Sequence, residues 1–391
     1  MKAFNPKQLL LLFSLFIYSC HHEPIIKTPP PPSHPPLVGP FITTIGGNGA
    51  ESVSVPDGTP ATSSPFNGVN GLAIDSIGNL YVSDLSQYVY KITPQGLVYH
   101  FAGTGMVGSD GDGGPATAAK VSGFVSLAVS PSGEVYICDE SAGCVRKVDK
   151  NGIITTIAGI SDFSNIGFSG DNGPATAARL GNPSGICFDK AGNLYIADAY
   201  NSRVRKVDAS GIITTFAGSG GFGTYSGENG AATDAVLQGP FSIAFNNKGE
   251  LFINDGPAIR KIDTGHIIHT IAGAEVMGDG GDGFSAASAL LHAVGDGHHG
   301  GIVFDSTGNL YFADAGNMRI RKINTTGIIN TIAGIGYKDY PYGAHYQGGY
   351  SGDGGSATAA KLNWPTGIII DFNGNIVFAD YNNGRIRKIY N

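Results

Sequence analysis

Charged residues are scarce in this chain, at 14% of its 391 residues, and those present form no basic cluster. The formal net charge of −7 and the lack of any Lys/Arg-rich stretch exclude an electrostatic nucleic-acid-binding surface. Long helical segments are also missing, because 60 glycines and 21 prolines interrupt the chain and its apolar residues come in short runs. The composition therefore predicts many short strands joined by tight turns, with no nucleic acid as a partner.

The longest apolar run lies at the N-terminus and is too short to span a bilayer stably. Residues 9–17 read LLLLFSLFI, follow Lys2 and Lys7, and lead into Cys20 through Tyr-Ser. A positive start and a short apolar run are typical of an export signal. The segment ending in Ile-Tyr-Ser-Cys resembles a bacterial lipobox, which implies that residues 1–19 are a signal peptide and that Cys20 is lipidated. The alternative is an ordinary secretory signal with a chance cysteine.

Residues 20–40 are expected to be a proline-rich tether. Six prolines at positions 29–32 and 35–36 favour polyproline II, a semi-rigid spacer. The lipid would then be the only contact of the chain with a membrane. His21 follows the cysteine where an aspartate would mean inner-membrane retention in enteric bacteria. The predicted location is therefore the cell envelope, at the outer membrane, with the periplasmic or surface orientation left open.

Beyond residue 40, one pattern of four short strands recurs six times. The clearest copy reads PSGICFD-KAGNLYIAD-AYNSRVRKVD-ASGIITTFAG, and we name its strands a to d. They are expected at residues 186–189, 194–198, 204–208 and 212–217, joined by Gly/Asn turns. An aspartate closes strand b in every copy: Asp84, Asp139, Asp198, Asp255, Asp314 and Asp380. An arginine lies in strand c of five copies: Arg146, Arg205, Arg260, Arg321 and Arg387.

Copies of this length with four strands each predict an all-β fold, a six-bladed β-propeller of four-stranded antiparallel blades. Residues 41–46 match strand d, whereas the chain stops at a strand c, residues 386–390. The N-terminal strand is therefore expected to complete the last blade and close the ring. The motifs NLYIAD, N-x-R-x-RK and GIITT-x-AG resemble those of the NHL-repeat family over about residues 41–391. This resemblance implies the same propeller fold but specifies function much less.

Residues that every copy repeats are interpreted as structural, capping a turn or pairing with a neighbouring strand. A second repeated element, with the pattern GDGGPATAAKL, occurs at residues 111–121, 170–180 and 352–362. It is expected to form one helical turn opened by proline. Its Asp-Gly pairs resemble parts of calcium loops but lack the set of oxygen ligands that a calcium hand needs. No cofactor is therefore predicted, and calcium at these loops is the alternative.

Two cysteines lie close together in the second copy. Cys138 is placed at the end of strand b and Cys144 at the start of strand c, so they could face one another across the hairpin. An exported protein meets an oxidising compartment, and a disulfide and two free thiols are both left open. Cys187 lies in an apolar strand a and is expected in the core.

The longest connection from strand d to the next strand a is rich in tyrosine. It spans residues 335–351 and reads IGYKDYPYGAHYQGGYS. Tyrosine faces with hydroxyls attached suit stacking on sugars or gripping a peptide. The alternative is that the tyrosines pack over their own blade. The candidate ligand-binding residues are Tyr337, Asp339, Tyr340, Tyr342, His345, Tyr346 and Tyr350.

A histidine-rich connection precedes the fifth copy and offers a weak metal candidate. His298 and His299, with His292, lie near three acids, Asp279, Asp282 and Asp296. Zinc or calcium there would suit a propeller metalloenzyme, but such sites draw ligands from several blades around the axis. The first strand-a positions are all small: Gly71, Ser126, Gly185, Ser242, Gly301 and Gly367. The sequence therefore predicts no catalytic residues and no metal site.

The leading hypothesis is a non-catalytic, lipid-anchored scaffold of the cell envelope. It would bind a protein, a peptide or a glycan through the face that displays the d-to-a connections, because variable loops on a rigid scaffold commonly carry binding sites. One alternative is a lyase- or hydrolase-like metalloenzyme that uses His298 and His299. The other is a purely structural envelope component.

Overall fold

The computed structural model describes residues 40–52, 54–122, 125–161, 167–221, 223–274, 276–295, 298–336 and 348–390. The chain divides into two units, Met1–Pro36 and Leu37–Asn391, and every described residue belongs to the second. The expected signal peptide, Cys20 and nearly all of the tether lie outside the described residues. Within the described ranges, no helix has the length and apolar character needed to cross a membrane.

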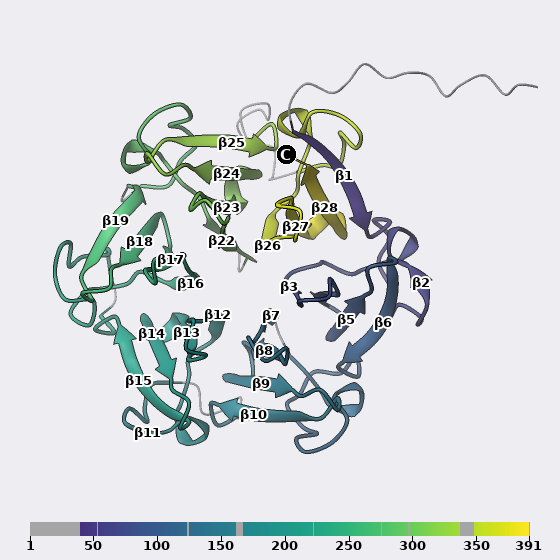
Figure 1. Cartoon of the computed structure of the whole chain (residues 1–391), viewed down its shortest axis with the longest axis horizontal. Coiled ribbons are helices and arrows are strands. Elements are labelled where there is room, and N and C mark those ends of the chain that lie inside the picture. Colours follow the sequence, from purple (N-terminus) through teal and green to yellow (C-terminus); the bar gives the residue numbers. More distant parts are fainter. Residues whose placement is uncertain are drawn as a thin grey trace, which may run out of the picture. The chain divides into compact units, whose positions relative to one another are not determined.

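Six antiparallel sheets surround a central axis as the blades of a propeller, which confirms the predicted all-β fold (Figure 1). Strand a is innermost in each blade and strand d outermost. The first three blades are β3 (Leu72–Ile74), β4 (Leu80–Asp84), β5 (Tyr88–Ile92) and β6 (Leu97–Ala102); β7 (Val125–Val129), β8 (Val135–Asp139), β9 (Cys144–Val148) and β10 (Ile154–Ala158); and β12 (Pro183–Phe188), β13 (Leu194–Asp198), β14 (Arg203–Val207) and β15 (Ile212–Ala217).

The other three blades repeat this order. They are β16 (Pro240–Phe245), β17 (Leu251–Asp255), β18 (Ala258–Ile262) and β19 (Ile268–Gly273); β22 (Ile302–Phe304), β23 (Leu310–Asp314), β24 (Arg319–Ile323) and β25 (Ile329–Ala333); and β26 (Pro365–Ile370), β27 (Ile376–Asp380), β28 (Arg385–Tyr390) and β1 (Phe41–Gly46). In the third blade, strands b and d have the predicted bounds, whereas strand a begins three residues earlier than predicted and strand c one residue earlier.

The turn between strands a and b is shaped by the polar residue that ends strand a. In the third blade, a carboxylate oxygen of Asp189 accepts hydrogen bonds from the N–H groups of Ala191 and Asn193, both at 2.9 Å. The Asn193 amide donates to the other oxygen at 2.7 Å, and Gly192 has a φ of +84°. This Asx turn needs glycine in the left-handed region, which explains the Gly-Asn pair before strand b.

The N-terminal strand closes the ring, as the two unmatched ends of the repeat predict. Strand β1 pairs antiparallel with β28, placing Phe41 opposite Tyr390 and Ile42 opposite Ile389. The Phe41 and Tyr390 rings stack with their centroids 4.5 Å apart, and Ile42 is fully buried. Figure 1 shows β1 as the outermost strand of the blade that also holds the C-terminal strands. The first and last strands therefore share one sheet, and the outer edge of β28 is covered.

The GDGGPATAA element extends each blade outwards, which the sequence did not predict. In the third blade, β11 (Gly173–Pro174) pairs with the outer strand β15 and leads into the 3-10 helix η3 (Ala175–Ala177). Single bridges of the same kind occur beside the outer strands of other blades. Leu180, which follows η3, is 1% exposed. The predicted helical turn is thus confirmed as a 3-10 turn, and the residues before it cover the edge of strand d.

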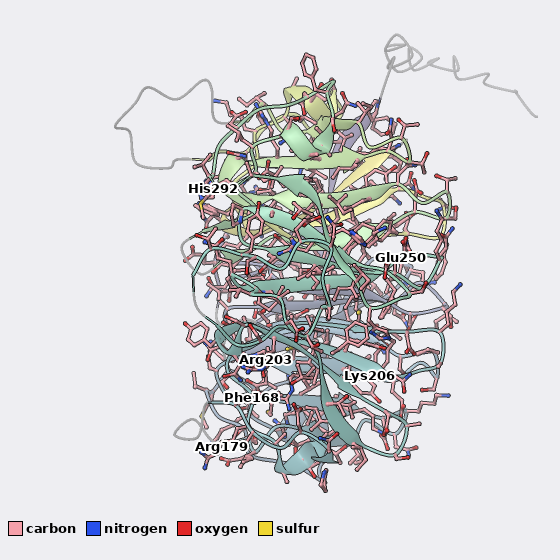
Figure 2. The ribbon with its side chains drawn as sticks, turned by 90° about the vertical axis from the view of Figure 1, so that its left-hand side faces the viewer. Phe168, Arg179, Arg203, Lys206, Glu250 and His292 are labelled. Atoms are coloured by element: carbon pink, nitrogen blue, oxygen red, sulfur yellow. The ribbon has the colours of Figure 1, made fainter. Side chains whose placement is uncertain are left out.

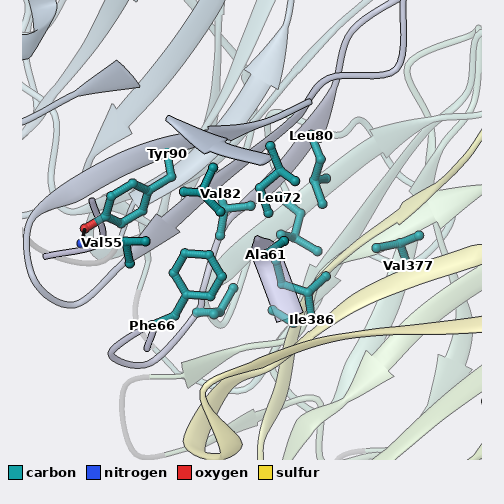
Figure 3. Close-up of a cluster of buried hydrophobic side chains, with 13 residues drawn as sticks. Val55, Ala61, Phe66, Leu72, Leu80, Val82, Tyr90, Val377 and Ile386 are labelled. Carbon is teal, nitrogen blue, oxygen red and sulfur yellow. Dashed lines mark hydrogen bonds between the residues drawn. The ribbon is translucent and has the colours of Figure 1, made fainter. Parts of the chain in front are cut away.

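Apolar side chains fill the interfaces between neighbouring blades. Figure 3 shows the interface at the point where the ring closes: Phe66 and Val82 of the first blade lie beside Val377 and Ile386 of the sixth. Both faces of a blade are buried in this way. Strand b, for example Leu194–Asp198, therefore reads as a nearly continuous apolar run instead of alternating with polar residues.

Inner strands of adjacent blades approach one another closely at their first residues. A Cβ atom on Gly185 would lie 2.5 Å from the carbonyl oxygen of Phe241 in the next blade. The Ser184 hydroxyl donates to that same oxygen at 3.0 Å. The positions equivalent to Gly185 in the six blades hold only glycine or serine. Most of them line a cavity of about 50 Å³ on the axis. The small residues seen in the sequence therefore close one end of the axis by backbone packing.

We expect Gly185→Ala to reduce the free energy of unfolding by about 1–3 kcal/mol, because the added methyl overpacks the contact between the third and fourth blades. Gly280→Ala is the matched control, since a Cβ at Gly280 meets nothing within 4 Å. It should change stability by about 0.5 kcal/mol or less. Urea unfolding of both variants measures the difference, and equal stabilities would contradict the close approach.

Candidate functional site

The repeated arginines and acids pair with each other inside the blades. In the third blade, Arg205 is fully buried and lies 2.7 Å from a carboxylate oxygen of Asp171 and 3.4 Å from one of Asp198. Asp171 belongs to the GDGGPATAA element and also accepts a hydrogen bond from the Thr215 hydroxyl at 2.7 Å. The equivalent ion pairs are Arg146–Asp112, Arg260–Glu228, Arg260–Asp255, Arg321–Asp282, Arg321–Asp314, Arg387–Asp353 and Arg387–Asp380. The structural interpretation of these residues is confirmed.

The first blade lacks this arginine, and its aspartate has a different environment. Tyr90 replaces the arginine, and its hydroxyl accepts a hydrogen bond from the Val55 N–H at 3.2 Å. Asp84 is 4% exposed, and burial raises its pKa to about 7 despite hydrogen bonds from the N–H groups of Asn67 and Ser86. A proton therefore neutralises this carboxyl near neutral pH, where the other blades use a guanidinium.

We expect Asp84 to make the protein less stable as the pH rises. Its pKa of about 7 in the folded state lies above its ordinary value of 3.8, so the folded chain binds this proton more tightly than the unfolded chain. Stability should fall from about pH 4 to pH 7, by up to about 1.4 kcal/mol per pH unit, and stay reduced above that window. Asp84→Asn should reduce this slope in urea unfolding measured from pH 5 to 8, and part of the slope should remain because burial also raises the pKa of Asp139 to about 7.

Asp198→Asn is the control for this titration. Burial raises the pKa of Asp198 only to about 6, because hydrogen bonds from Asn201 and Gly181 and the charge of Arg205 oppose the rise. We therefore compare how steeply the free energy of unfolding changes with pH between pH 6 and 8. Asp84→Asn should alter this slope more than Asp198→Asn does. Parallel stability curves for Asp84→Asn and the wild type would show that Asp84 does not titrate there.

The acids that a calcium or zinc site would use are engaged by arginines. Asp171 and its equivalents bind the strand-c guanidinium groups, as described above. In the histidine-rich connection, Asp279 lies 2.6 Å from Arg319 and Asp282 lies 2.8 Å from Arg321. Across the described ranges, no three or more His, Cys, Asp or Glu side chains gather where they could hold a metal ion.

The candidate histidines are only partly described. His298–His299 form the short strand β21, which pairs with β20 (Val294–Gly295), and nothing is described of their side chains. The His292 N–H donates to Asp314 at 2.7 Å, and this residue lies at the face of the d-to-a connections (Figure 2). Asp296 lies outside the described residues. The backbone N–H of His292 is thus a hydrogen-bond donor to Asp314, the repeated aspartate of the fifth blade.

Of the seven candidate residues in the tyrosine-rich connection, Tyr350 is the one that the structure describes, and it packs on its own blade. The guanidinium carbon of Arg385 lies 3.6 Å from the centroid of the Tyr350 ring. The Tyr350 hydroxyl donates a hydrogen bond to a carboxylate oxygen of Asp353 at 2.7 Å. Phe168 covers Arg203 in the same way at 3.8 Å, and Figure 2 shows the two side by side. The other six candidates, Tyr337, Asp339, Tyr340, Tyr342, His345 and Tyr346, lie outside the described residues.

The structure does not join Cys138 and Cys144, and both are buried free thiols. Cys138 lies opposite Val145, whereas Cys144 lies opposite Asp139, so the two side chains leave opposite faces of the sheet. The Cys138 thiol donates to the Pro183 carbonyl at 3.0 Å and Cys144 to the Ser161 hydroxyl at 3.5 Å. A disulfide between them, left open by the sequence, does not match this register.

The d-to-a connections and b–c loops of several blades carry exposed apolar side chains, which sequence reasoning did not single out on the face that it predicted. This face lies on the left in Figure 2, where Phe168 and His292 are labelled, and the a–b turn holding Glu250 lies on the right. The exposed apolar residues of the loop face are Met106, Val107, Ile160, Phe168, Tyr200, Val276, Met277 and Tyr350. Their exposed fractions run from 41% to 62%, so each presents a large apolar area to solvent. The sequence signal that could have identified some of these residues is a pair of adjacent apolar residues shortly after strand d, as at Met106-Val107 and Val276-Met277.

The comparisons with known proteins agree on one fold. The model of the teneurin NHL domain matches residues 163–226 and 221–280. Mouse teneurin-4 is 30% identical over 387 residues, which cover 91% of this chain but only 13% of teneurin-4. This chain thus spans a small part of the length of the teneurins that it matches.

Solved structures show the same fold at low sequence identity. A protein of Bacteroides thetaiotaomicron described as an auxiliary nutrient binding protein has a TM-score of 0.62 at 17% identity, over 90% of this chain and 76% of that one. A gluconolactonase of Xanthomonas campestris has a TM-score of 0.52 at 12% identity, over 91% and 98%. With the repeated motifs, the family match and the six-bladed ring, the chain belongs to the NHL-repeat β-propeller family.

Proposed function

We propose that this chain is a lipid-anchored binding scaffold of the bacterial cell envelope, and that a partner protein docks on its loop face. The observation that carries this proposal is the group of exposed apolar side chains on the d-to-a connections and b–c loops. Methionine and aromatic residues are enriched at protein interfaces, so exposed side chains of these types on one face favour a docking site there. A protein partner is favoured over a glycan because these described side chains are mainly aliphatic.

The scaffold beneath this face is rigid enough to hold a binding surface. Phe168 and Tyr350 are held over Arg203 and Arg385, which lie at the start of strand c. Met106 and Val107 lie three and four residues after Gly103, whose N–H donates to the Ala116 carbonyl at 3.1 Å. Aromatic and apolar groups on anchored loops lose little conformational entropy on binding. A non-catalytic role is part of the proposal, since Asp279 and Asp282 of the histidine-rich connection form ion pairs with Arg319 and Arg321.

The anchor and the location rest on the N-terminal sequence. Cys20 after a short apolar run supports lipidation, and the proline-rich tether would carry the propeller clear of the membrane. The Bacteroides protein described as an auxiliary nutrient binding protein supports a binding role for a propeller of this shape. Metabolic labelling with a radioactive fatty acid tests the anchor: label on the wild type and none on Cys20→Ala is expected, and equal labelling would contradict lipidation at this residue.

Replacing apolar side chains on the loop face should abolish partner docking. We expect the triple variant Met106→Ser, Val107→Ser, Met277→Ser to recover about tenfold less of the partner that the wild type retains from crosslinked cell envelopes, because interface anchors dominate affinity. The matched control, Ile77→Ser with Phe372→Ser, removes equally exposed apolar groups from the a–b turns. It should leave recovery unchanged. Loss of the partner in the control and not in the triple variant would reject the loop face.

A further inference from the structure

A cavity of about 970 Å³ opens along the axis on the face opposite the loop face. It is lined only by the inner strands and by the a–b turns that follow them. Figure 1 shows the strands that line it as the innermost of their blades: β3, β7, β12, β16, β22 and β26. At the other end of the axis, the close contacts around Gly185 surround the cavity of about 50 Å³ described above. The larger cavity is a funnel that opens at the turn face.

The walls of the funnel are apolar and differ from one side to the other. One ring of six aliphatic residues lies deepest: Leu72, Leu127, Ile186, Ile243, Ile302 and Ile368. The next ring outwards holds the last residue of each strand a. Three adjacent blades supply phenylalanine to it, Phe188, Phe245 and Phe304, whereas the other three supply Ile74, Val129 and Ile370. The funnel thus has an aromatic wall facing an aliphatic wall.

The aromatic wall is fixed in position by neighbouring rings. Phe188 packs edge-on against Tyr136 with centroids 4.8 Å apart, and Phe245 packs in the same way against Tyr195 at 4.8 Å. Phe304 makes the equivalent contact with Phe252 at 4.6 Å. Each phenylalanine is only partly buried, so part of its ring faces the funnel. Preset aromatic faces of this kind suit a flat apolar ligand.

Hydrogen-bonding groups lie at the mouth, above the aromatic wall. Lys190, Asn247 and Ser306 occupy the rim of the same three blades. The Lys190 ammonium donates to the Asn247 carbonyl at 2.7 Å, which links two of these turns. In addition, strand a is the terminal strand of each sheet, so one backbone edge faces the axis and offers N–H and C=O groups. The side chains of the lining are therefore apolar inside and polar at the opening, and backbone polar groups lie along the strands between them.

From this arrangement we infer that the funnel is a binding site for a small aromatic molecule with a hydrogen-bonding group at one end. The aromatic part lies against Phe188, Phe245 and Phe304, and the polar part meets the rim. A volume of about 970 Å³ is at the upper end of the range for sites of small organic ligands. This site is separate from the loop face, so its loss would leave the proposed partner docking unaffected.

The test uses N-phenyl-1-naphthylamine, a neutral fluorescent probe with two aromatic units and one N–H donor. The full chain should bind one molecule of probe saturably, with a rise in fluorescence. Phe245→Ser, in the middle of the aromatic wall, should weaken binding about tenfold or more, since a buried aromatic contact is lost. Ser306→Arg is the second variant: Ser306 is exposed at the rim, so the core is unchanged while the mouth is obstructed.

Met106→Ser and Met277→Ser are the matched controls, because they remove exposed apolar side chains from the loop face. Both should bind the probe as the wild type does. The inference is overturned if the probe does not bind with one-to-one saturation, or if binding is unchanged in both funnel variants. It is equally overturned if a loop-face variant weakens binding as much as Phe245→Ser does.

Discussion

Arg205→Met is expected to lower the free energy of unfolding by about 3–5 kcal/mol, the largest effect of any single substitution considered for this fold. Arg205 is fully buried between the carboxylates of Asp198 and Asp171. Its removal leaves Asp198, which is also fully buried, without its ion-pair partner. An uncompensated buried charge is costly because no water replaces the lost partner. Urea unfolding at pH 8, where Asp198 is ionised, measures the loss.

Two further variants separate this charge effect from simple loss of packing. Arg205→Met with Asp198→Asn should recover part of the lost stability, because the buried site then holds no unpaired charge. Lys206→Met, one residue further along the same strand, removes the ammonium of a partly buried lysine near the Tyr195 ring and should cost about 0.5 kcal/mol or less. If Arg205→Met and Lys206→Met were equally mild, the pairs would not hold the blades together.

Removal of strand β1 is expected to destabilise the ring more than any single core substitution within that strand. Ile42→Ala alone should cost about 2–5 kcal/mol, because Ile42 is fully buried. A chain that begins at residue 47 also loses the Phe41–Tyr390 stack and exposes the edge of β28. It should therefore unfold at a lower urea concentration than Ile42→Ala, both compared with a chain beginning at residue 40.

The control for ring closure lies in the same strand. Thr43 pairs with Lys388 but is only partly buried, so Thr43→Ala should change the unfolding midpoint little. An unchanged midpoint for the chain that begins at residue 47 would contradict closure of the sixth blade by β1. Association of that shortened chain into larger species is the expected secondary effect, because an open strand edge pairs readily with another chain.

Most of the fold could be predicted from the repeated motifs, because the same residues form the same strands and turns in each blade. The aspartate at the end of strand b and the Gly-Asn turn before it set the strand bounds, and Leu194–Asp198 and Ile212–Ala217 have the predicted limits. The mismatch between residues 41–46 and the end of the chain predicted ring closure. Strand a was placed too short in the third copy, since Pro183 and Gly185 do not resemble strand residues in isolation.

Contacts between distant segments could not be read from the sequence. Asp171 lies 34 residues before Arg205, and only the outward extension of the blade brings them together. The relation of Cys138 to Cys144 depends on a one-residue difference in register, which decides the face from which each thiol leaves. Local spacing limits such pairs but does not determine them.

The sequence predicted which face of the propeller carries the candidate site, but it did not predict which residues of that face are exposed. The sequence pointed to the d-to-a connections, and exposed apolar side chains do gather there. It favoured the tyrosines, yet Tyr350 is held over Arg385 and bonded to Asp353. Met106 and Met277 were overlooked because a lone methionine in a glycine-rich loop carries no motif. The funnel at the other end of the axis was also missed, since its wall combines single residues from several repeats.

Site-specific photo-crosslinking in living cells tests the central claim, that the loop face is where a partner protein docks. A photoreactive phenylalanine analogue would replace Met277 on the loop face or Phe372 on an a–b turn, which are 50% and 65% exposed. We expect a discrete protein adduct on irradiation when the analogue is at Met277 and none when it is at Phe372. Adducts from Phe372 alone, or equally from both positions, would contradict the account.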